Sequence, residues 1–367
     1  MALLVGLGLG WWVEYSGEGR GSSFYNAATS ADCDKNLGRR WLFFFQRYFT
    51  RQMCTAHDGP ESWSGIEVAG SELRFFVIGD WGRDGWCCQT DVGYEMARAA
   101  EVVKPAFLLN VGDNFYQTGV ASVDDEQWQT SWRGVYLDNY KSMETIPWLT
   151  VLGNHDYGRG DPTPQLQYAK REARWVLPDR QYTKLFHLPG GATVLFAFID
   201  TTPTFYNYSK SLMKLFNVSY EQSRRNMEWL DQTLTDSNDD WKVVVSHHPI
   251  LTRGSHSGEE KEGFDYLYEV LRPVLLKHKV AVLFSGHDHD MQHLDDGELQ
   301  YVISGAGSQV RDLSDKLARA SKAGRFGVGR QGFAICDIVG DLMHLQFVDY
   351  RGTMIYATNM TRTPWKR

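Results

Sequence analysis

Short runs of hydrophobic residues recur along the chain from about residue 73, separated by stretches whose hydrophobic positions follow a helical period. The run at 73–79, Leu-Arg-Phe-Phe-Val-Ile-Gly, is typical of a strand buried on both faces of a sheet. The same pattern predicts strands at 106–111, 147–152, 182–188, 193–199, 241–245, 280–284, 300–303, 332–338 and 343–349. Helical spacing predicts helices at 91–103, 124–140, 165–175, 220–234 and 264–278. Strands that alternate with helices, with antiparallel additions near the end, predict an α/β layered sandwich of mixed sheets with flanking helices.

The first 70 residues lack this pattern. Glycine-rich and aromatic patches occur there without a sustained period. We interpret residues 1–70 as an N-terminal extension, either a signal or anchor segment or a weakly ordered stretch. Residues 71–352 then form one compact domain, and residues 353–367 a C-terminal tail.

Composition narrows the class of protein. With 367 residues, 43% of them hydrophobic, the chain can bury a large core. The formal net charge of −7 and the absence of a long basic cluster predict no nucleic-acid partner. Five cysteines are too few for a disulfide-built scaffold, although Cys33 and Cys54 are candidates to close a loop. The neighbours Cys87 and Cys88 do not readily bridge each other, and Cys336, in a hydrophobic run, is expected to be a buried free thiol.

Side chains that can bind metal ions follow five of the predicted strands. They are Asp80, Asp113, Tyr116, Asn154, His247, His287 and His289. Any one of these turns has an ordinary structural explanation, but open α/β sheets place ligands where strands end, so we expect the whole set to converge. His287 and His289 are two residues apart, so in an extended segment both imidazoles project to the same side.

The kinds of donor atom indicate which metals fit. A phenol such as Tyr116 binds at neutral or acidic pH only beside a strongly Lewis-acidic ion such as ferric iron. Oxygen and nitrogen donors without thiolate suit iron, zinc or manganese. Bound metals would also concentrate positive charge for an anionic substrate in a net acidic protein.

Three glycosylation acceptor sequences bear on the compartment. They begin at Asn207, Asn217 and Asn359. Together with the hydrophobic opening at 2–13, they favour the secretory pathway, and so a secreted or acidic lumenal protein. That opening is too short for an ordinary membrane span, and we predict no stable membrane partner.

The motifs resemble those of the purple acid phosphatases, a branch of the calcineurin-like metallophosphoesterases. The resemblance rests on Gly-Asp-x-Gly, Gly-Asp-x-x-Tyr, Gly-Asn-His-Asp, Val-x-x-His and Gly-His-x-His in this order, and covers roughly residues 73–350. It is to the small, single-domain, tartrate-resistant acid phosphatase-like type. The resemblance implies that Asp80, Tyr116 and His289 bind Fe(III), and that Asp113 bridges to a second metal. Asn154, His247 and His287 would bind that divalent ion, which is iron, zinc or manganese.

Two further histidines match residues that contact phosphate or protonate the leaving group in that family. They are His155, beside Asn154, and His256, nine positions after His247. His248 departs from the family, in which tyrosine usually follows the metal-binding histidine. We expect His248 to serve in packing or in lining the pocket.

The resemblance implies an acid phosphatase that hydrolyses phosphate monoesters by attack of metal-bound hydroxide, with residues 71–352 as the catalytic domain. Small phosphate esters or phosphoproteins would be its substrates. A phosphodiesterase or nucleotide pyrophosphatase on the same scaffold is the alternative. A non-catalytic secreted glycoprotein is a third reading, which the complete ligand set opposes. The oligomeric state stays open.

Overall fold

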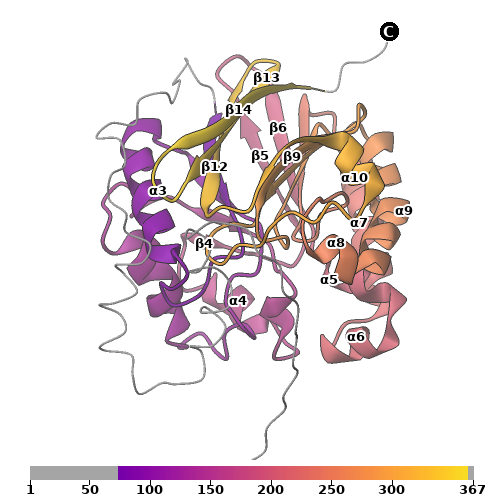
Figure 1. The fold of residues 1–367 in the computed structure, drawn as a ribbon, viewed down its shortest axis with the longest axis horizontal. Helices are drawn as coiled ribbons and strands as arrows, with labels where there is room; N and C mark the ends of the chain where they lie inside the picture. The colour runs from indigo at the N-terminus through magenta and orange to yellow at the C-terminus, as the bar shows by residue number, and fades with distance from the viewer. Residues whose placement is uncertain (1–72, 363–367) are drawn as a thin grey trace, which may run out of the picture.

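The computed structural model describes residues 73–362, which form two seven-stranded sheets packed face to face (Figure 1). The first sheet has the order β14 (Met354–Thr361), β13 (Leu342–Asp349), β12 (Gly332–Val339), β1 (Leu73–Ile78), β2 (Phe107–Asn110), β3 (Trp148–Thr150) and β4 (Trp175–Val176). The second has the order β11 (Gly324–Val328), β9 (Met291–Asp295), β10 (Gln300–Ser304), β8 (Val282–Ser285), β7 (Trp241–Val245), β6 (Thr193–Phe198) and β5 (Tyr182–His187).

Parallel pairing in the middle of each sheet brings several strand ends to one edge. In the first sheet β1, β2, β3 and β4 run parallel, and in the second β6, β7, β8 and β10 do. The two sheets are joined at this edge, because the N–H of Gly79, after β1, donates to the carbonyl of Ser304, at the end of β10, over 2.8 Å. The loops at the carboxyl ends of both sets of strands therefore lie next to one another.

Helices cover the outer faces of the sandwich (Figure 1). The first sheet is flanked by α3 (Gln89–Val103) and by the π-helix η1 (Trp128–Leu137), and the second by α7 (Tyr220–Asp236) and α9 (Lys261–Lys277). The shorter helices are η2 (His155–Tyr157), α4 (Thr163–Tyr168), α5 (Thr202–Phe205), η3 (Tyr206–Tyr208), α6 (Lys210–Leu215), α8 (His256–Glu259) and α10 (Ala318–Ala323). This arrangement confirms the predicted layered sandwich of mixed sheets with flanking helices.

Aromatic side chains fill the space between the sheets. The ring of Phe75 on β1 lies 5.5 Å from that of Phe196 on β6 and 5.9 Å from that of Phe284 on β8, both edge to face. Aromatic pairs of this geometry contribute about 0.5–1.5 kcal/mol beyond the area that they bury. They hold the two sheets, and so the loops at their shared edge, in a fixed relation.

The hydrophobic period explains the long helix α9. Its buried positions include Phe264, Leu267, Leu271 and Leu275, spaced three or four residues apart on one face. That face packs on the second sheet, in a core cluster with Leu283 of β8. Sequence spacing predicted this helix at 264–278, and the structure begins it three residues earlier.

Several predicted elements differ from the structure. The helix expected at 165–175 is only Thr163–Tyr168, because the chain then turns into β4, and β9 and β11 were not predicted. The expected tail at 353–367 contains β14, which pairs with β13 along Met354–Thr361 as the edge strand of the first sheet. Polar residues in β9 and half-exposed positions in β14 hide the alternation that marks a strand.

The described cysteines differ in whether they are free or disulfide-bonded. Cys336 is buried and free, as expected, and Cys87 and Cys88 each take part in a disulfide bond. Cys33, Cys54 and the 1–70 extension lie outside the described residues.

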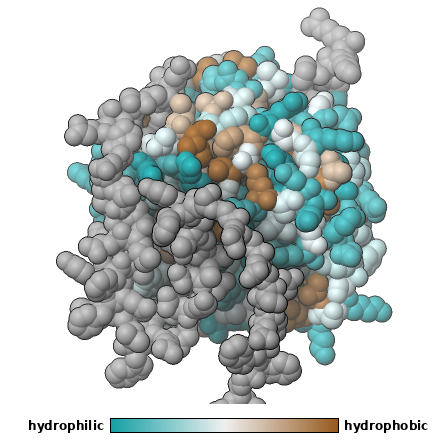
Figure 2. Space-filling model, viewed as in Figure 1, coloured by the Kyte–Doolittle hydropathy of each residue, from teal (hydrophilic) through white to brown (hydrophobic). Residues whose placement is uncertain are grey.

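Within residues 73–362, no helix has the length and hydrophobicity needed to cross a bilayer. On the face shown in Figure 2, the visible described surface is mostly hydrophilic, with small scattered hydrophobic areas.

Candidate metal centre

Three side chains surround the hydroxyl oxygen of Tyr116 at the shared edge of the two sheets. Tyr116 Oη lies 3.0 Å from Asp80 Oδ1, 3.0 Å from Asp113 Oδ2 and 2.9 Å from His289 Nε2. We call Asp80, Asp113, Tyr116 and His289 the Tyr116 cluster. A phenol has one proton, so Tyr116 can donate a full hydrogen bond to only one of these two carboxylates. Donor atoms about 2.1 Å from a metal ion in octahedral geometry lie about 3.0 Å apart, so these spacings fit one bound ion.

A second group of donors lies on the other side of Asp113. His247 Nε2 is 3.2 Å from Asn154 Oδ1 and 3.3 Å from Asp113 Oδ1, and His287 Nδ1 is 3.1 Å from Asn154 Oδ1. We call Asp113, Asn154, His247 and His287 the Asn154 cluster. Its donor spacings also fit a single ion. All seven donors expected from the sequence therefore meet at one place.

Asp113 belongs to both clusters because its two oxygens face opposite ways. Oδ2 contacts Tyr116, while Oδ1 contacts His247 and accepts the backbone N–H of His155 over 2.9 Å. The side chain is buried, with the residue 1% exposed. A carboxylate placed in this way can bridge two cations.

The backbone at the ends of the strands is shaped to aim these donors. Asp80, Asp113 and His287 have φ angles of 59°, 49° and 69°, in the left-handed region that residues other than glycine seldom adopt. Gly153 has no space for a side chain, because a Cβ there would lie 2.2 Å from Asp113 Oδ1. Gly112, with φ of 95°, would similarly place a Cβ 2.6 Å from His247 Nδ1. These positions explain why the donors follow Gly-Asp and Gly-Asn sequences.

Each histidine of the Asn154 cluster is oriented through its second ring nitrogen. His247 Nδ1 lies 2.9 Å from the carbonyl oxygen of Val111, which leaves Nε2 for an ion. His287 Nε2 lies 2.7 Å from Glu260 Oε2, which leaves Nδ1 for an ion. Partners of this kind fix the tautomer and raise the basicity of a metal-binding imidazole. Glu260 was not predicted from the sequence, since an acidic residue at the start of a helix has many other uses.

In the protein without metal, burial and neighbouring charges shift the pKa values of the same groups. Burial would raise the pKa of Asp113, but His247 and His155 hold it well below its usual range. Burial opposes protonation of His247, yet the carboxylate of Asp113 raises its pKa to about 9. Burial and the carboxylates of Asp113 and Asp80 raise the pKa of Tyr116 well above its ordinary value. Tyr116 is therefore a neutral phenol until a strong Lewis acid takes the place of its proton.

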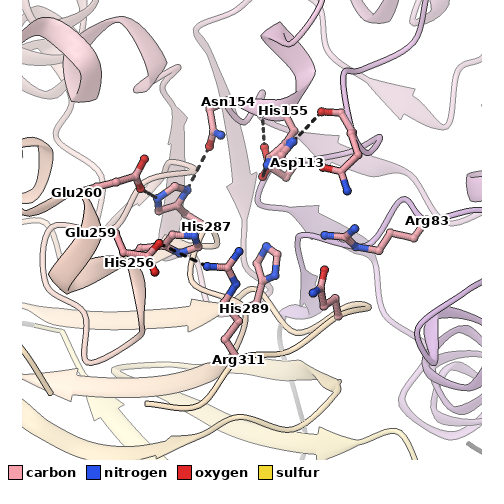
Figure 3. Close-up of a pocket in the computed structure, with 12 residues that line it drawn as sticks. Arg83, Asp113, Asn154, His155, His256, Glu259, Glu260, His287, His289 and Arg311 are labelled. Carbon is pink, nitrogen blue, oxygen red and sulfur yellow. Dashed lines mark hydrogen bonds and ion pairs between the residues drawn. The ribbon is translucent and has the colours of Figure 1, made fainter. Parts of the chain in front are cut away.

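His155 and His256 stand at the rim of the donor clusters (Figure 3). His155 Nδ1 lies 2.7 Å from the carbonyl oxygen of Gln117, and its ring lies 4.5 Å from that of Tyr116. The His256 ring stacks on His287 at 4.5 Å, and its Nδ1 lies 3.0 Å from Asp288 Oδ1. Burial would lower the pKa of His256, but the Asp288 carboxylate raises it. His256 can therefore hold a proton beside the clusters, with Nε2 free to donate it.

His248 lies behind the clusters and does not line the cavity. It is fully buried, its ring stacks on Phe205 at 4.1 Å, and its Nδ1 lies 3.0 Å from Thr201 Oγ1. Burial and the neighbouring histidines His287 and His247 lower its pKa well below the usual range. The packing role expected for His248 agrees with this position.

The cavity above the two clusters holds more charged groups than the sequence predicted. Its volume is about 270 Å³, and Figure 3 shows the side chains that line it. Besides expected residues, the lining includes Arg83, Gln117, Glu259, Glu260, Gln309 and Arg311. Arg83 directly follows the Asp80-Trp81-Gly82 turn, and Arg311 lies four residues after the Ser304–Gly307 turn, but neither position carries a motif of its own.

The three glycosylation acceptors do not line this cavity. Asn217 and Asn359 are exposed, whereas Asn207 is half-buried and its side-chain amide donates to Tyr266 Oη over 2.9 Å. Asn359 lies on the edge strand β14. Glycosylation at all three positions stays a prediction.

Comparison with known proteins identifies the family. The model described as calcineurin-like phosphoesterase matches residues 73–291. Tartrate-resistant acid phosphatase type 5 of Oryctolagus cuniculus is 30% identical, with 81% of this chain and 93% of the relative covered. Purple acid phosphatase 4 of Arabidopsis thaliana is 34% identical, with 79% of this chain and 84% of the relative covered.

Solved structures agree on the fold. GAP50, the anchor in the inner membrane complex of Plasmodium, has a TM-score of 0.68 at 23% identity, with 81% of this chain and 90% of that chain covered. Purple acid phosphatase PPD1 of yellow lupin, Lupinus luteus, has a TM-score of 0.58 at 13% identity, with 83% of this chain and 55% of that chain covered. The sequence relatives and the matched family model together establish that the chain is a member of the calcineurin-like phosphoesterase family, on its purple acid phosphatase branch.

Proposed function

We propose that this phosphoesterase is an acid phosphatase that hydrolyses phosphate monoesters at a binuclear centre of Fe(III) and a divalent metal. The Tyr116 cluster would hold Fe(III), and the Asn154 cluster would hold iron, zinc or manganese in the divalent state. The observation that carries the proposal is the contact of Tyr116 Oη with Asp80, Asp113 and His289 at 2.9–3.0 Å. A phenol enclosed by carboxylates is stable as an anion only if a highly charged cation binds with it.

In the proposed reaction, each residue around the two clusters has its own role. When bound, two cations would neutralise a phosphate ester and lower the pKa of a water molecule. Asp113 would fix the separation of the ions, and Glu260 would hold His287 in the tautomer that presents Nδ1. His256, held by Asp288, would donate a proton to the departing oxygen, and His155 would contact the phosphate. Because His256 must be protonated, activity should be highest at acidic pH.

Other functions are separable by experiment. A phosphodiesterase or nucleotide pyrophosphatase would use the same donors, and comparing hydrolysis of an aryl monoester, a diester and ATP distinguishes it. The complete set of seven donors argues against a non-catalytic role. The glycosylation acceptors and the hydrophobic opening support placement in the secretory pathway.

The sharpest test is a visible spectrum of the iron-loaded protein beside its Tyr116→Phe variant. We expect a violet wild type, because a phenolate bound to Fe(III) absorbs visible light, and a variant without that band. Tyr136→Phe is the matched control, since Tyr136 is also a buried tyrosine but lies outside both clusters. It should keep the band. A colourless wild type with two metals bound, or a violet Tyr116→Phe variant, would refute the assignment.

A further inference from the structure

Arg83 is a buried cation that lies against the ring of Tyr116. Its guanidinium carbon is 3.7 Å from the centre of that ring, and Figure 3 shows the group directed into the cavity. The residue is 6% exposed, and neither Nε nor Nη1 has a hydrogen-bond partner among residues 73–362. Burying a charge without an anionic partner is costly, so this position indicates that the charge itself has a role at Tyr116.

The main chain holds Arg83 and Tyr116 in a fixed relation. The N–H of Tyr116 donates to the carbonyl of Gly82, directly before Arg83, over 2.9 Å. Gly82 has no space for a side chain, because a Cβ there would overlap the carbonyl oxygen of Asn114. The N–H of Arg83 donates to Oε1 of the buried Gln89 over 3.1 Å. The turn that carries the guanidinium group is therefore packed directly on the turn that carries the phenol.

Arg83 acts on Tyr116 in the opposite direction to the carboxylates of the Tyr116 cluster. Burial, Asp113 and Asp80 raise the pKa of Tyr116, and the positive charge of Arg83 opposes them. A cation over the face of an aromatic ring is attracted by the π electrons, and the attraction grows when the ring carries the negative charge of a phenolate. A guanidinium group keeps its charge throughout the range in which proteins are folded. Arg83 therefore stabilises electrons on the Tyr116 ring at every working pH.

We propose that Arg83 tunes the bond between Tyr116 and the ion of the Tyr116 cluster, by withdrawing electron density from the phenolate. This inference rests on the proposed function, in which that ion is Fe(III). A phenolate that donates less electron density leaves the ion a stronger Lewis acid, and one that is easier to reduce, than the same donors would without the arginine. Arg83 is a positioning residue in this role, because it acts on the ion through Tyr116 and does not bind it.

The visible band of a ferric phenolate measures this effect directly. Light moves an electron from the phenolate to Fe(III), so the energy of the band depends on how tightly the ring holds that electron. The guanidinium group faces the ring, whereas an ion would bind at the Oη end of the side chain, among the other donors. The positive charge thus holds the electron on the ring more strongly than on the ion, and moves the band to shorter wavelength.

Substitution of Arg83 in the iron-loaded protein tests the proposal without an activity assay. In Arg83→Gln we expect the visible band to move to longer wavelength by on the order of 10–50 nm, because a charge close to the ring is removed. Arg83→Lys keeps a positive charge and should retain most of the wild-type band position. An unshifted band in Arg83→Gln would overturn the proposal. So would an equal shift in both variants, because the cause would then be the shape of the side chain and not its charge.

A redox titration provides the second readout. Dithionite supplies the one electron that converts Fe(III) to Fe(II), and the loss of the violet colour follows the reduction. In Arg83→Gln we expect a lower midpoint potential than in the wild type, because a nearby positive charge no longer favours the reduced ion. Arg83→Lys should stay close to the wild type. A midpoint potential that is unchanged or higher in Arg83→Gln would contradict the withdrawal of electron density by Arg83.

A second arginine that lies over a tyrosine ring provides the matched control. The guanidinium carbon of Arg319 is 4.4 Å from the centre of the Tyr268 ring, and neither residue lines the cavity. Arg319→Gln should therefore leave both the band and the potential unchanged. If Arg83→Gln does not fold, Arg83→Met, which keeps a long apolar side chain, takes its place with the same expected shifts.

The outcomes separate this inference from the proposed function. A violet wild type that hydrolyses aryl phosphate, with an unshifted band in Arg83→Gln, would refute the role of Arg83 and leave the proposed function standing. A violet wild type that hydrolyses no ester, with the expected shifts, would do the reverse. An Arg83→Gln variant whose KM for aryl phosphate rises while its band stays in place would show that Arg83 contacts the substrate alone, and would overturn the inference.

Discussion

The two donor clusters share Asp113 but differ in charge. With Tyr116 deprotonated, the Tyr116 cluster contributes two carboxylates, a phenolate and one imidazole. The Asn154 cluster contributes the shared carboxylate, one amide and two imidazoles. Charge and donor hardness suit a trivalent ion in the first cluster and a divalent ion in the second. The asymmetry of the proposed centre therefore comes from the two different sets of donor side chains that the fold brings together.

Removing the shared residue should have the largest effect. Asp113→Asn takes a negative charge from both clusters at once, so we expect both ions to bind weakly and phosphatase activity to fall by more than about a thousandfold. Metal analysis of the purified variant checks the first expectation, and an aryl phosphate assay checks the second.

Asp200→Asn is the control for this change, because Asp200 is also fully buried but contacts Tyr157 and belongs to neither cluster. It should keep two metals per chain even if its stability falls. Two tightly bound metals in Asp113→Asn would show that the clusters are independent and would contradict the bridging role.

A substitution at Glu260, next to His287, should affect metal binding by the Asn154 cluster alone. Glu260→Gln weakens the contact that orients His287 Nε2, so we expect the affinity of the Asn154 cluster for its ion to fall by about tenfold to hundredfold. The Tyr116 cluster should keep its ion and its visible band. Titration of the divalent metal, followed by activity and by the spectrum, measures the two clusters separately.

Glu262→Gln provides the comparison, since Glu262 is an exposed acid two residues further along that does not line the cavity. Its metal affinity should match the wild type. An equal loss of both ions in Glu260→Gln would mean that the clusters do not respond separately.

The donors were predictable because they follow hydrophobic strands, and Asp80, Asp113, Asn154 and His287 each come directly after a glycine. The ends of parallel strands must meet at one edge, so Asp80, Asn154 and His247 could be placed together from the sequence. The residues around them were not predictable in this way. Glu260 reaches His287 from the start of α9, and Arg83 lines the cavity without belonging to a motif, so no local pattern records either position.

The strands of the fold were also predictable only where the local sequence carries a strong hydrophobic pattern. Strands with strong hydrophobic runs, such as β1 and β7, were predicted within a few residues. The strand β9 and the edge strand β14 were missed, because their few buried hydrophobic residues do not form a continuous run and the strands depend on pairing with β10 and β13. Their pairing depends on segments distant in the sequence.

The smallest expected effect concerns the stability of the two forms of the protein against pH. In the metal-free form the Asp113 carboxylate raises the pKa of His247 from 6.5 to about 9. A raised pKa in the folded state gives stability that is complete below pH 6.5 and is lost as the pH rises through about 9. We expect the melting temperature of chelator-treated protein to fall by on the order of 5 °C across this window.

The metal-loaded protein should show the opposite trend over the same window. Metal binding requires His247 to be neutral and Tyr116 to be deprotonated, so protons compete with the ions and affinity rises with pH. Thermal melts of both forms at several pH values measure the two slopes. In a chelator-treated His247→Gln variant the alkaline loss should disappear, because the group that carries the charge is gone. If that variant keeps the full loss, the protonated imidazole of His247 is not its source, and the two clusters do not differ in the way that their charges indicate.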